Sequence, residues 1–397
     1  MTTVYDCIVI GSGPGGGASA WHLANAGHSV LVLEKQQLPR YKPCGGGVGP
    51  EVAKWFDFDF MPAVSTTITS VRYTWQCGDR VDAPLEDIPP LWMVRRDIFD
   101  HYVILQAVAK GAVLQTGVTV SSIAREAARW AVTTADGTVF HSRFLIGADG
   151  AKGLTAKWLG LAARKIVSGG AIEVEIRAPV PDQHVAHFEF GMIKGGYLWN
   201  FPKADGHSIG IGQVGQGSMD MRAPLAKYVE YFGLSLDGVR QHGHPLLIWR
   251  GDSRLHAEGA LLVGEAAGIV DPFSAEGIRP ALYTGMRAAE AVTQSLAGDA
   301  RALERYSERI AKDHGTDMRW AARVANVFYN IPRLAYTLSV HRPSATRTVA
   351  RLMTGDLRWR DVAPGALKRL VSPRALLSSG AGGSTRGQRI DDVIPLP

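Results

Sequence analysis

Residues 6–35 contain a strand, a glycine-rich loop, a helix and a second strand, in that order. The apolar run Cys7–Ile10 has the length of a buried parallel strand. It leads into the loop Gly11–Gly17, after which small and apolar residues recur at helical spacing. The second apolar run, Val30–Leu33, ends at the acidic residue Glu34. This order is typical of a Rossmann-type unit that binds a dinucleotide.

Each residue type in this unit has a physical role. Gly11 permits a tight turn, Gly13 lets the backbone approach a pyrophosphate, and Gly16 lets the helix pack closely on the strand. The helix N-terminus offers N–H groups and a positive dipole end to the phosphates. Glu34, followed by Lys35, is placed to accept hydrogen bonds from an adenosine ribose. A glycine-rich surface loop is the alternative, and the presence of both strands, the helix and the acid disfavours it.

The cysteine content and the apolar pattern indicate a reducing compartment. The 397 residues include three cysteines, Cys7, Cys44 and Cys77, without CxxC spacing or a disulfide framework. Residues 1–3 lead directly into the first strand, so we expect no signal peptide. No apolar run reaches the roughly 18 residues that a spanning helix needs. We therefore expect a cytoplasmic protein, with the cytoplasmic membrane surface as a second possible location.

The net charge of +6 is unevenly spread along the chain. Residues 301–397 hold 17 lysines and arginines against 8 acidic residues, a net charge of +9. A solvated helical surface is the simplest interpretation, followed by contact with anionic lipid or an acidic redox partner. Nucleic acid ranks third, because no nucleic-acid-binding motif accompanies the charge.

Later segments return to the opening unit. Strand patterns at 138–142 and 144–147, the second ending before Asp149 and Gly150, predict a further strand of the same sheet far along the chain. Residues 166–250 alternate with period two and predict an antiparallel sheet, with one face on a ligand and the other on solvent. Helices are predicted over 98–110, 224–232 and 279–296. Helical patterns continue over 301–371.

Two further stretches suggest a site for a flat or long apolar ligand. Three glycines follow Pro43-Cys44, which indicates that something flat or bulky approaches this backbone closely. Tyr197, Trp199 and Phe201 alternate on one strand and share a face, which fits either an aromatic wall of a site or ordinary sheet core. The histidine pairs at 242/244 and 184/187 lack a third ligand, so we predict no metal site.

The order of motifs resembles the FAD-binding set of the para-hydroxybenzoate hydroxylase-like flavoproteins. These motifs are GxGxxG with Glu34, Val94-x-Arg96-x-x-Phe99-Asp100, Gly147-Ala148-Asp149-Gly150 and Gly264-Glu265-Ala266-Ala267-Gly268. Within that superfamily, Lys42-Pro43-Cys44-Gly45-Gly46-Gly47 and Tyr197-Leu198-Trp199-Asn200-Phe201-Pro202 resemble the geranylgeranyl reductase family, as does Leu352-Met353-Thr354-Gly355-Asp356 with Trp359. The resemblance covers nearly the whole chain.

The resemblance implies non-covalent FAD and a set of site residues. The implied cofactor-binding residues are Gly11, Gly13, Gly16, Glu34, Lys35, Cys44, Gly45, Arg96, Asp149, Gly150, Gly264, Glu265, Gly268, Gly277 and Ile278. The implied substrate-binding residues are Tyr197, Trp199, Phe201 and Pro202, with Cys44 as the catalytic proton donor or as a small packing residue.

Several of these residues carry open alternatives. Arg96 pairs with the cofactor, with a carboxylate, or in a surface ion pair. Gly277-Ile278 opens a helix whose N-terminus favours the negative charge of reduced flavin. The family usually has Asp where Glu265 stands and Pro where Lys194 stands. Lys194 meets a substrate phosphate or is simply solvated.

The predicted fold is α/β, with a discontinuous Rossmann-type FAD-binding domain, an antiparallel-sheet substrate domain and a helical C-terminal region. The boundaries are 1–67, 92–165 and 255–300 for the FAD domain, 68–91 and 166–254 for the substrate domain, 301–372 for the helices, and 373–397 for a disordered tail.

The activity implied by the resemblance is reduction of isolated double bonds in the prenyl chain of a lipid, quinone or pigment. Because no second GxGxxG is present, NAD(P)H, ferredoxin and another donor all stay open as the source of the electrons. Three alternatives stay open: a flavin monooxygenase or halogenase, a non-redox FAD-containing cyclase, and a non-enzymatic carrier of prenylated partners. Halogenases carry a WxWxIP signature, against which Tyr197, Phe201 and the Cys-Gly-Gly sequence argue. We also expect peripheral membrane contact.

Overall fold

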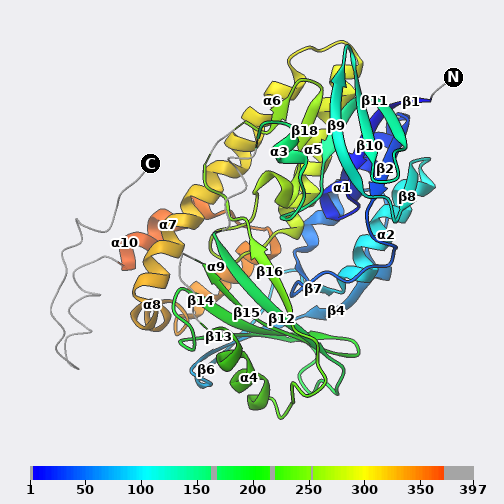
Figure 1. Ribbon diagram of the computed structural model, residues 1–397. Coiled ribbons are helices and arrows are strands. Elements are labelled where there is room, and N and C mark those ends of the chain that lie inside the picture. The colour runs from blue at the N-terminus through cyan, green and yellow to red at the C-terminus, as the bar shows by residue number, and fades with distance from the viewer. Residues whose placement is uncertain (1–2, 162–167, 215–219, 252–253, 371–397) are drawn as a thin grey trace.

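The first strand, β1 (Val4–Ile10), lies inside an eight-stranded sheet that begins with the predicted Rossmann-type unit (Figure 1). The structure is a computed structural model that describes residues 3–161, 168–214, 220–251 and 254–370. The loop after β1 opens α1 (Pro14–Asn25), and β2 (Val30–Glu34) follows. β1 pairs in parallel with β2 on one side and with β11 (Val139–Gly147) on the other. The chain therefore returns to its first strand after a long excursion, as predicted.

The rest of this sheet extends the parallel core at both edges. β8 (Val113–Thr116) pairs with β2, and β18 (Ala260–Leu262) with β11, both in parallel, while β17 (His256–Ala257) pairs antiparallel with β18. The remaining strands, β9 (Val120–Glu126) and β10 (Arg129–Thr134), form an antiparallel extension on β11. The two strands predicted at 138–142 and 144–147 are one strand, because β11 pairs with β10 through its first half and with β1 from His141 to Gly147.

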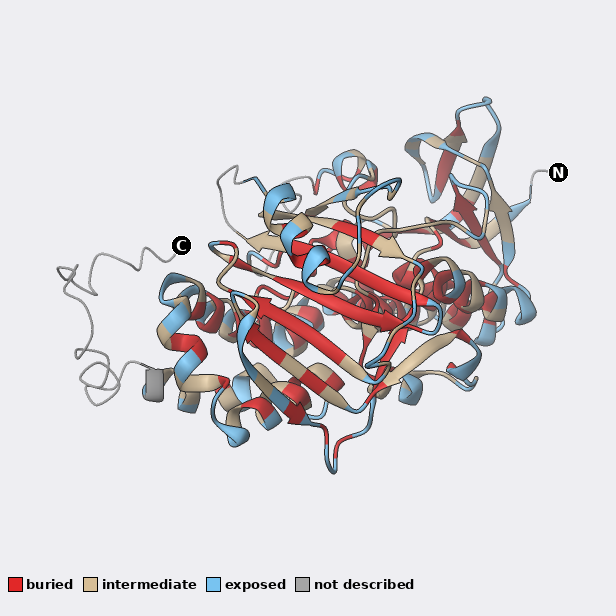
Figure 2. Ribbon diagram, turned by 90° about the horizontal axis from the view of Figure 1, so that it is seen from below, coloured by how far each residue is buried: buried red, intermediate tan, exposed pale blue. Residues whose placement is uncertain are grey.

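The second large sheet has seven strands in the order β16-β12-β15-β14-β13-β5-β6. Its strands are β5 (Ser70–Trp75), β6 (Gly78–Pro84), β12 (Gly169–Ile176), β13 (Val185–Phe190), β14 (Gly196–Lys203), β15 (Gly206–Val214) and β16 (His242–Leu246). All pairs are antiparallel except β13 with β5, which run parallel. Figure 2 shows buried residues along the strands of this sheet.

The prediction that one face of this sheet meets solvent was wrong. α4 (Arg222–Tyr231) covers that face with Leu225, Tyr228 and Val229, which pack against apolar side chains of β12, β14 and β15. The period-two pattern identified the strands correctly, but it could not show that a short helix in the same segment folds back over them. The central strands β12, β14 and β15 are consequently covered on this face, whereas the edge strand β6 is largely exposed.

A small sheet and a helical layer complete the fold. β7 (Leu91–Val94) pairs with β3 (Gly47–Val48) and β4 (Val64–Ile68), and short 3₁₀ turns occupy Pro50–Trp55, Met61–Ala63 and Gly264–Ala267. The helices are α2 (Arg96–Ala109), α3 (Thr155–Trp158), α5 (Ile278–Leu296), α6 (Ala302–Ile310), α7 (Thr316–Asn330), α8 (Pro332–Ser339), α9 (Pro343–Thr354) and α10 (Trp359–Leu370). A π-helical turn, Ala311–Gly315, joins α6 to α7.

The helical pattern predicted over 301–371 thus corresponds to α6–α10 as far as the structure reaches, and the predicted tail, 373–397, lies outside the described residues. α1 packs against α5 and α2 beside the first sheet, while α10 packs against α7 (Figure 1). Among the residues that the structure describes, no helix combines the length and the apolar character needed to cross a bilayer.

Candidate functional site

One large cavity is lined by residues of both large sheets, of the loop 40–47 and of the C-terminal helices. Its volume is about 970 Å³, near the upper end of the roughly 300–1,000 Å³ usual for ligand sites. The predicted site residues that line it are Gly11, Gly13, Glu34, Lys35, Cys44, Gly45, Arg96, Asp149, Gly150, Tyr197, Trp199, Phe201, Gly264, Glu265, Gly277 and Ile278. Gly16, Gly268 and Pro202 do not line it.

The glycine-rich loop shows why Gly16 is set back from the cavity. A Cβ on Gly16 would lie 1.9 Å from the carbonyl oxygen of Gly11, so this glycine serves the packing of α1 on the preceding turn. Gly11 itself has φ +100°, a conformation that glycine adopts readily. Gly13 caps α1, and a Cβ there would meet only Arg40, at 3.6 Å. The cavity therefore opens beside Gly13, at the N-terminus of α1.

Glu34 is held at the end of β2 by several donors. One carboxylate oxygen accepts the N–H and hydroxyl of Ser12, at 2.9 and 2.8 Å, and the other accepts the N–H of Gln36 at 3.0 Å. Arg40 lies 3.7 Å from the same carboxylate. These contacts fix the acid at the cavity wall next to the glycine-rich loop, which is the arrangement that ribose recognition requires.

Asp149 presents an unsatisfied acceptor in the cavity wall. Its Oδ2 atom accepts the N–H and hydroxyl of Thr155, both at 2.9 Å. Its Oδ1 atom is buried and has no hydrogen-bond partner among the residues that the structure describes. Buried polar atoms are nearly always satisfied, so this oxygen indicates a place for a donor on a bound ligand.

The loop that contains Cys44 lies directly against the aromatic face of β14. A Cβ on Gly45 would come within 2.7 Å of the Phe201 ring and 3.0 Å of the Trp199 indole nitrogen. Gly46 has φ +74°, and a Cβ there would lie 2.0 Å from the carbonyl oxygen of Val94. The close approach that the glycine run predicted is therefore made by two aromatic rings and a strand of the small sheet.

Tyr197, Trp199 and Phe201 form a continuous aromatic wall along β14. Neighbouring rings in this row are 6.1 and 6.3 Å apart, and Phe188 of β13 packs on Phe201 at 5.1 Å. Trp199 and Phe201 belong to a buried apolar cluster against which Tyr197 packs, and all three rings also line the cavity, so their positions are compatible with both interpretations of the alternating pattern. Pro202 falls on the opposite parity of the strand, which explains its absence from the lining.

Comparison with known proteins identifies relatives of this chain in sequence and in fold. The FAD binding domain family matches residues 4–196. Geranylgeranyl diphosphate reductase of Rhodobacter capsulatus is 30% identical over 82% of this chain and 85% of its own length. Menaquinone reductase of Mycolicibacterium smegmatis is 28% identical over 90% of this chain and 91% of its own length. A geranylgeranyl bacteriochlorophyll reductase-like structure from Thermoplasma acidophilum shares the fold, with TM-score 0.76 and 19% identity over 95% of this chain and 99% of that one.

The chain belongs to the geranylgeranyl reductase family. It is an FAD-dependent oxidoreductase, as both the matched domain and the names of these relatives indicate. The unsatisfied Asp149 oxygen, the fixed Glu34 carboxylate and the open α1 N-terminus fit the polar parts of FAD.

Arg96 is the first residue of α2 in this family member, two residues earlier than the predicted helix start. Its guanidinium is buried and forms a two-point ion pair with Asp100, with both hydrogen bonds at 2.7 Å. Burial alone would lower the pKa of Arg96, but Asp100 and the neighbouring Cys44 raise it. Arg40, which the sequence analysis did not identify, lies 3.2 Å from Asp100. Of the three interpretations of Arg96, the carboxylate pair is the one observed.

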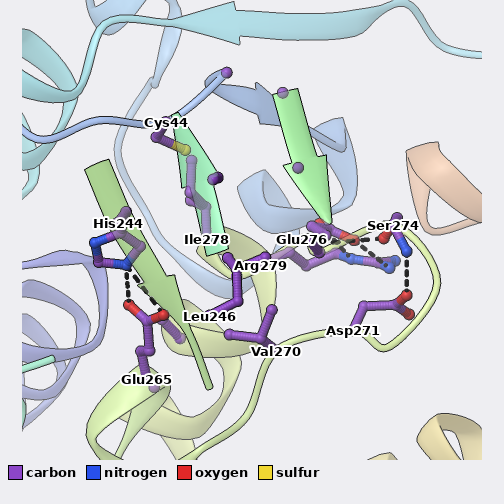
Figure 3. A pocket seen from close by; sticks show the side chains of 18 of the residues that line it. Cys44, His244, Leu246, Glu265, Val270, Asp271, Ser274, Glu276, Ile278 and Arg279 are labelled. Carbon is purple, nitrogen blue, oxygen red and sulfur yellow. Dashed lines mark hydrogen bonds and ion pairs between the residues drawn. The ribbon is translucent and has the colours of Figure 1, made fainter. Parts of the chain in front are cut away.

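Glu265, at the position where the resemblance implies Asp, has its own protein partners. His244 Nε2 donates to its carboxylate at 2.9 Å, as Figure 3 shows, and Lys42 Nζ lies 3.8 Å away. Burial by itself raises the pKa of Glu265, but the His244 hydrogen bond and the Lys42 charge bring it below its ordinary value. The extra methylene therefore lets the carboxylate reach β16. His244 was considered only as a metal ligand, a pattern that gave no hint of this contact.

Hydrogen bonds and an ion pair fix the loop before α5 at the cavity. Asp271 accepts the N–H groups of Phe273 and Ser274, both at 2.8 Å, and Glu276 pairs with Arg279 at 2.9 Å (Figure 3). Tyr197 of the aromatic wall donates its hydroxyl to the Ser274 carbonyl at 2.6 Å. These contacts fix Gly277 and Ile278, where α5 begins, so that the positive end of its dipole faces the cavity.

Within the described ranges, no three histidine, cysteine or acidic side chains are grouped so that they could hold a metal ion. His242 instead packs against Tyr41 in a tilted arrangement, with ring centroids 4.2 Å apart, and His184 Nδ1 contacts the Thr67 carbonyl at 2.7 Å. The two histidine pairs noted in the sequence thus have structural contacts.

Proposed function

We propose that this chain uses FAD to reduce isolated carbon–carbon double bonds in the prenyl chain of a lipid, quinone or pigment. The observation that carries the proposal is the position of the Cys44 loop, which lies against the aromatic wall of β14 and beside Arg96. The names of relatives, a geranylgeranyl diphosphate reductase and a menaquinone reductase, support a prenylated substrate. The eight-stranded sheet and its helices would carry the cofactor, and the seven-stranded sheet the substrate.

Each part of the cavity contributes to this reaction. When bound, FAD supplies two electrons as a hydride equivalent to one carbon of the double bond, with NAD(P)H or ferredoxin as the source. Gly13 and the α1 N-terminus hold the pyrophosphate, and Glu34 holds the ribose. The aromatic wall holds the prenyl chain and excludes water. The Cys44 thiol gives its proton to the second carbon, and the thiolate regains a proton from solvent.

Product analysis under anaerobic conditions tests the proposed reaction. Purified protein, reduced with dithionite, is mixed with geranylgeranyl diphosphate or with an unsaturated menaquinone. We expect products heavier by two hydrogens for each reduced bond, together with reoxidation of the flavin absorbance. Unchanged substrate mass combined with oxygen uptake on addition of air would instead support a monooxygenase.

We further propose that the helical region attaches to the cytoplasmic membrane surface without insertion. The cavity lining extends to α9 and α10, and Arg342, directly before α9, Arg347 of α9, and Arg360 and Lys368 of α10 are exposed. Exposed cations near anionic lipid contribute about 1 kcal/mol each, so their combined effect is large at low salt. A lipid substrate could then pass from the bilayer into the cavity.

Cosedimentation with phosphatidylglycerol vesicles measures this attachment. We expect binding at low ionic strength that falls steeply as salt shortens the screening length. The triple variant R342Q/R347Q/R360Q should bind more weakly, whereas R301Q/R305Q/R309Q, which removes the same charge from α6 and the residue before it, should bind as wild type does. Failure of the wild-type protein to sediment with these vesicles at low salt would exclude the attachment.

A further inference from the structure

Two oppositely charged side chains of the seven-stranded sheet hold two peptide groups of the Cys44 loop. Glu173 of β12 accepts the N–H of Cys44 at 2.5 Å. Lys203, at the end of β14, donates to the carbonyl of Gly45 at 2.6 Å. The N–H of Gly46 then donates to Cys44 Sγ at 3.4 Å. The peptide groups before Cys44 and after Gly45 are therefore fixed, and the thiol itself accepts a third contact.

Both charged groups are almost completely buried, with 2% of Glu173 and 1% of Lys203 exposed. Burying charges costs more free energy than a buried pair usually returns, so stability does not explain these residue types. Burial lowers the pKa of Lys203 to about 8, which leaves the ammonium charged near neutral pH. The same effect raises the pKa of Glu173, although Ser208 opposes it through a hydrogen bond of 2.7 Å.

Tyr41 and Gly46, which lie next to Glu173 and Lys203, also fit the contacts that these two side chains make with the Cys44 loop. Tyr41 donates its hydroxyl to the Glu173 carboxylate at 3.1 Å, so this acceptor holds two points of the segment 41–44. A Cβ on Gly46 would lie 2.9 Å from the Lys203 ammonium nitrogen. The glycine therefore provides the space that the ammonium occupies. Neither Lys203 nor Glu173 was singled out from the sequence.

We infer that Glu173 and Lys203 are positioning residues that fix the Cys44 turn and direct its thiol into the cavity. This role rests on the proposed function, in which Cys44 gives a proton to the substrate. It also connects the Cys44 turn to the seven-stranded sheet, because Glu173 and Lys203 belong to that sheet, whose aromatic wall is proposed to hold the prenyl chain. Strands β12 and β14 thereby fix the position of the proposed proton donor relative to the aromatic wall.

Amide hydrogen exchange tests, without any substrate, whether Glu173 and Lys203 fix the Cys44 turn. In the FAD-loaded protein, Lys203→Met and Glu173→Leu should speed exchange in the segment 41–48 by about tenfold, the effect of losing one charge-assisted hydrogen bond. Glu173→Gln should keep most protection, because its amide oxygen can take the place of Oε2 while its NH2 group donates to Ser208. The exposed α4 variants Lys227→Met and Glu230→Gln are the matched controls, with no expected change.

Single-turnover reduction of geranylgeranyl diphosphate then tests the link to Cys44. Lys203→Met should slow prenyl reduction about tenfold when Cys44 is present and should have no further effect on the Cys44→Ala enzyme, because residues that act together are not additive. An equal loss in both backgrounds would show a merely structural role and overturn the inference.

The two experiments separate the inference from the proposed function. Unchanged exchange in both Lys203→Met and Glu173→Leu overturns the inference whether or not any substrate is reduced. Absence of prenyl reduction by the wild-type enzyme overturns the proposed function instead. Amide hydrogen exchange still decides in that case whether Glu173 and Lys203 fix the turn. If Lys203→Met does not retain FAD, Glu173→Leu supplies the same comparison from the other side of the turn.

Discussion

Gly13→Val is expected to give a folded protein without FAD. Gly13 has extended backbone angles, which valine adopts readily, and its Cβ would meet only Arg40, at 3.6 Å. The apoprotein should therefore tolerate the side chain. The cofactor should not, because the valine methyl groups would occupy the space in which the pyrophosphate meets the α1 N-terminus. Loss of two charge-assisted hydrogen bonds, at about 1.5–3 kcal/mol each, corresponds to at least about 100-fold weaker binding.

Flavin absorbance after purification and titration of added FAD measure this loss, and circular dichroism reports whether the fold is kept. Gly243→Val is the matched control, because nothing lies within 4 Å of its added Cβ and the residue is exposed. Gly16→Ala is the contrast, since its Cβ would lie 1.9 Å from the Gly11 carbonyl oxygen and should disturb the fold itself. A yellow Gly13→Val protein with wild-type FAD affinity would place the pyrophosphate elsewhere.

The parts of this molecule that sequence reasoning recovered are those that local physics determines. The loop after β1, the α1 helix and the acidic end of β2 follow from glycine geometry, helical spacing and apolar runs within thirty-five residues. The return of β11 to β1 was also recovered, because a buried strand ending in Gly147 reads as parallel-sheet core without knowledge of its partner.

The parts that were missed depend on contacts between distant segments. Glu173 meets Cys44 across 129 residues, and Lys203 meets Gly45 across 158. In the sequence, Glu173 is one polar position of an alternating strand, and Lys203 is a charge after a proline. Nothing local distinguishes a buried carboxylate from a solvated one in such a pattern. Arg96 is a different case, since its ion pair with Asp100 has the i,i+4 spacing of a helix and follows from the sequence once the start of α2 is moved two residues earlier.

Cys44→Ser is expected to retain FAD and flavin reduction but to slow alkene reduction about 100-fold, the usual scale for losing a positioned acid. Serine can still accept the Gly46 N–H that now reaches the thiol at 3.4 Å, so the turn should keep its shape. An alcohol is a far weaker acid than a thiol, and the second carbon of the double bond would wait for a proton from water. Cys44→Ala, which removes the donor entirely, should behave alike.

The other two cysteines provide the controls. Cys7 is fully buried within β1, where burial raises the pKa of its thiol, and Cys77 lies in the turn between β5 and β6, outside the cavity lining. Cys7→Ala and Cys77→Ala should therefore turn over nearly as wild type does. Stopped-flow reoxidation of dithionite-reduced enzyme by geranylgeranyl diphosphate separates proton delivery from flavin reduction, because the flavin starts fully reduced in every variant. If Cys44→Ala is reoxidised as fast as wild type, the thiol only packs against Ile278 and its neighbours, and the proton reaches the substrate from water or another group.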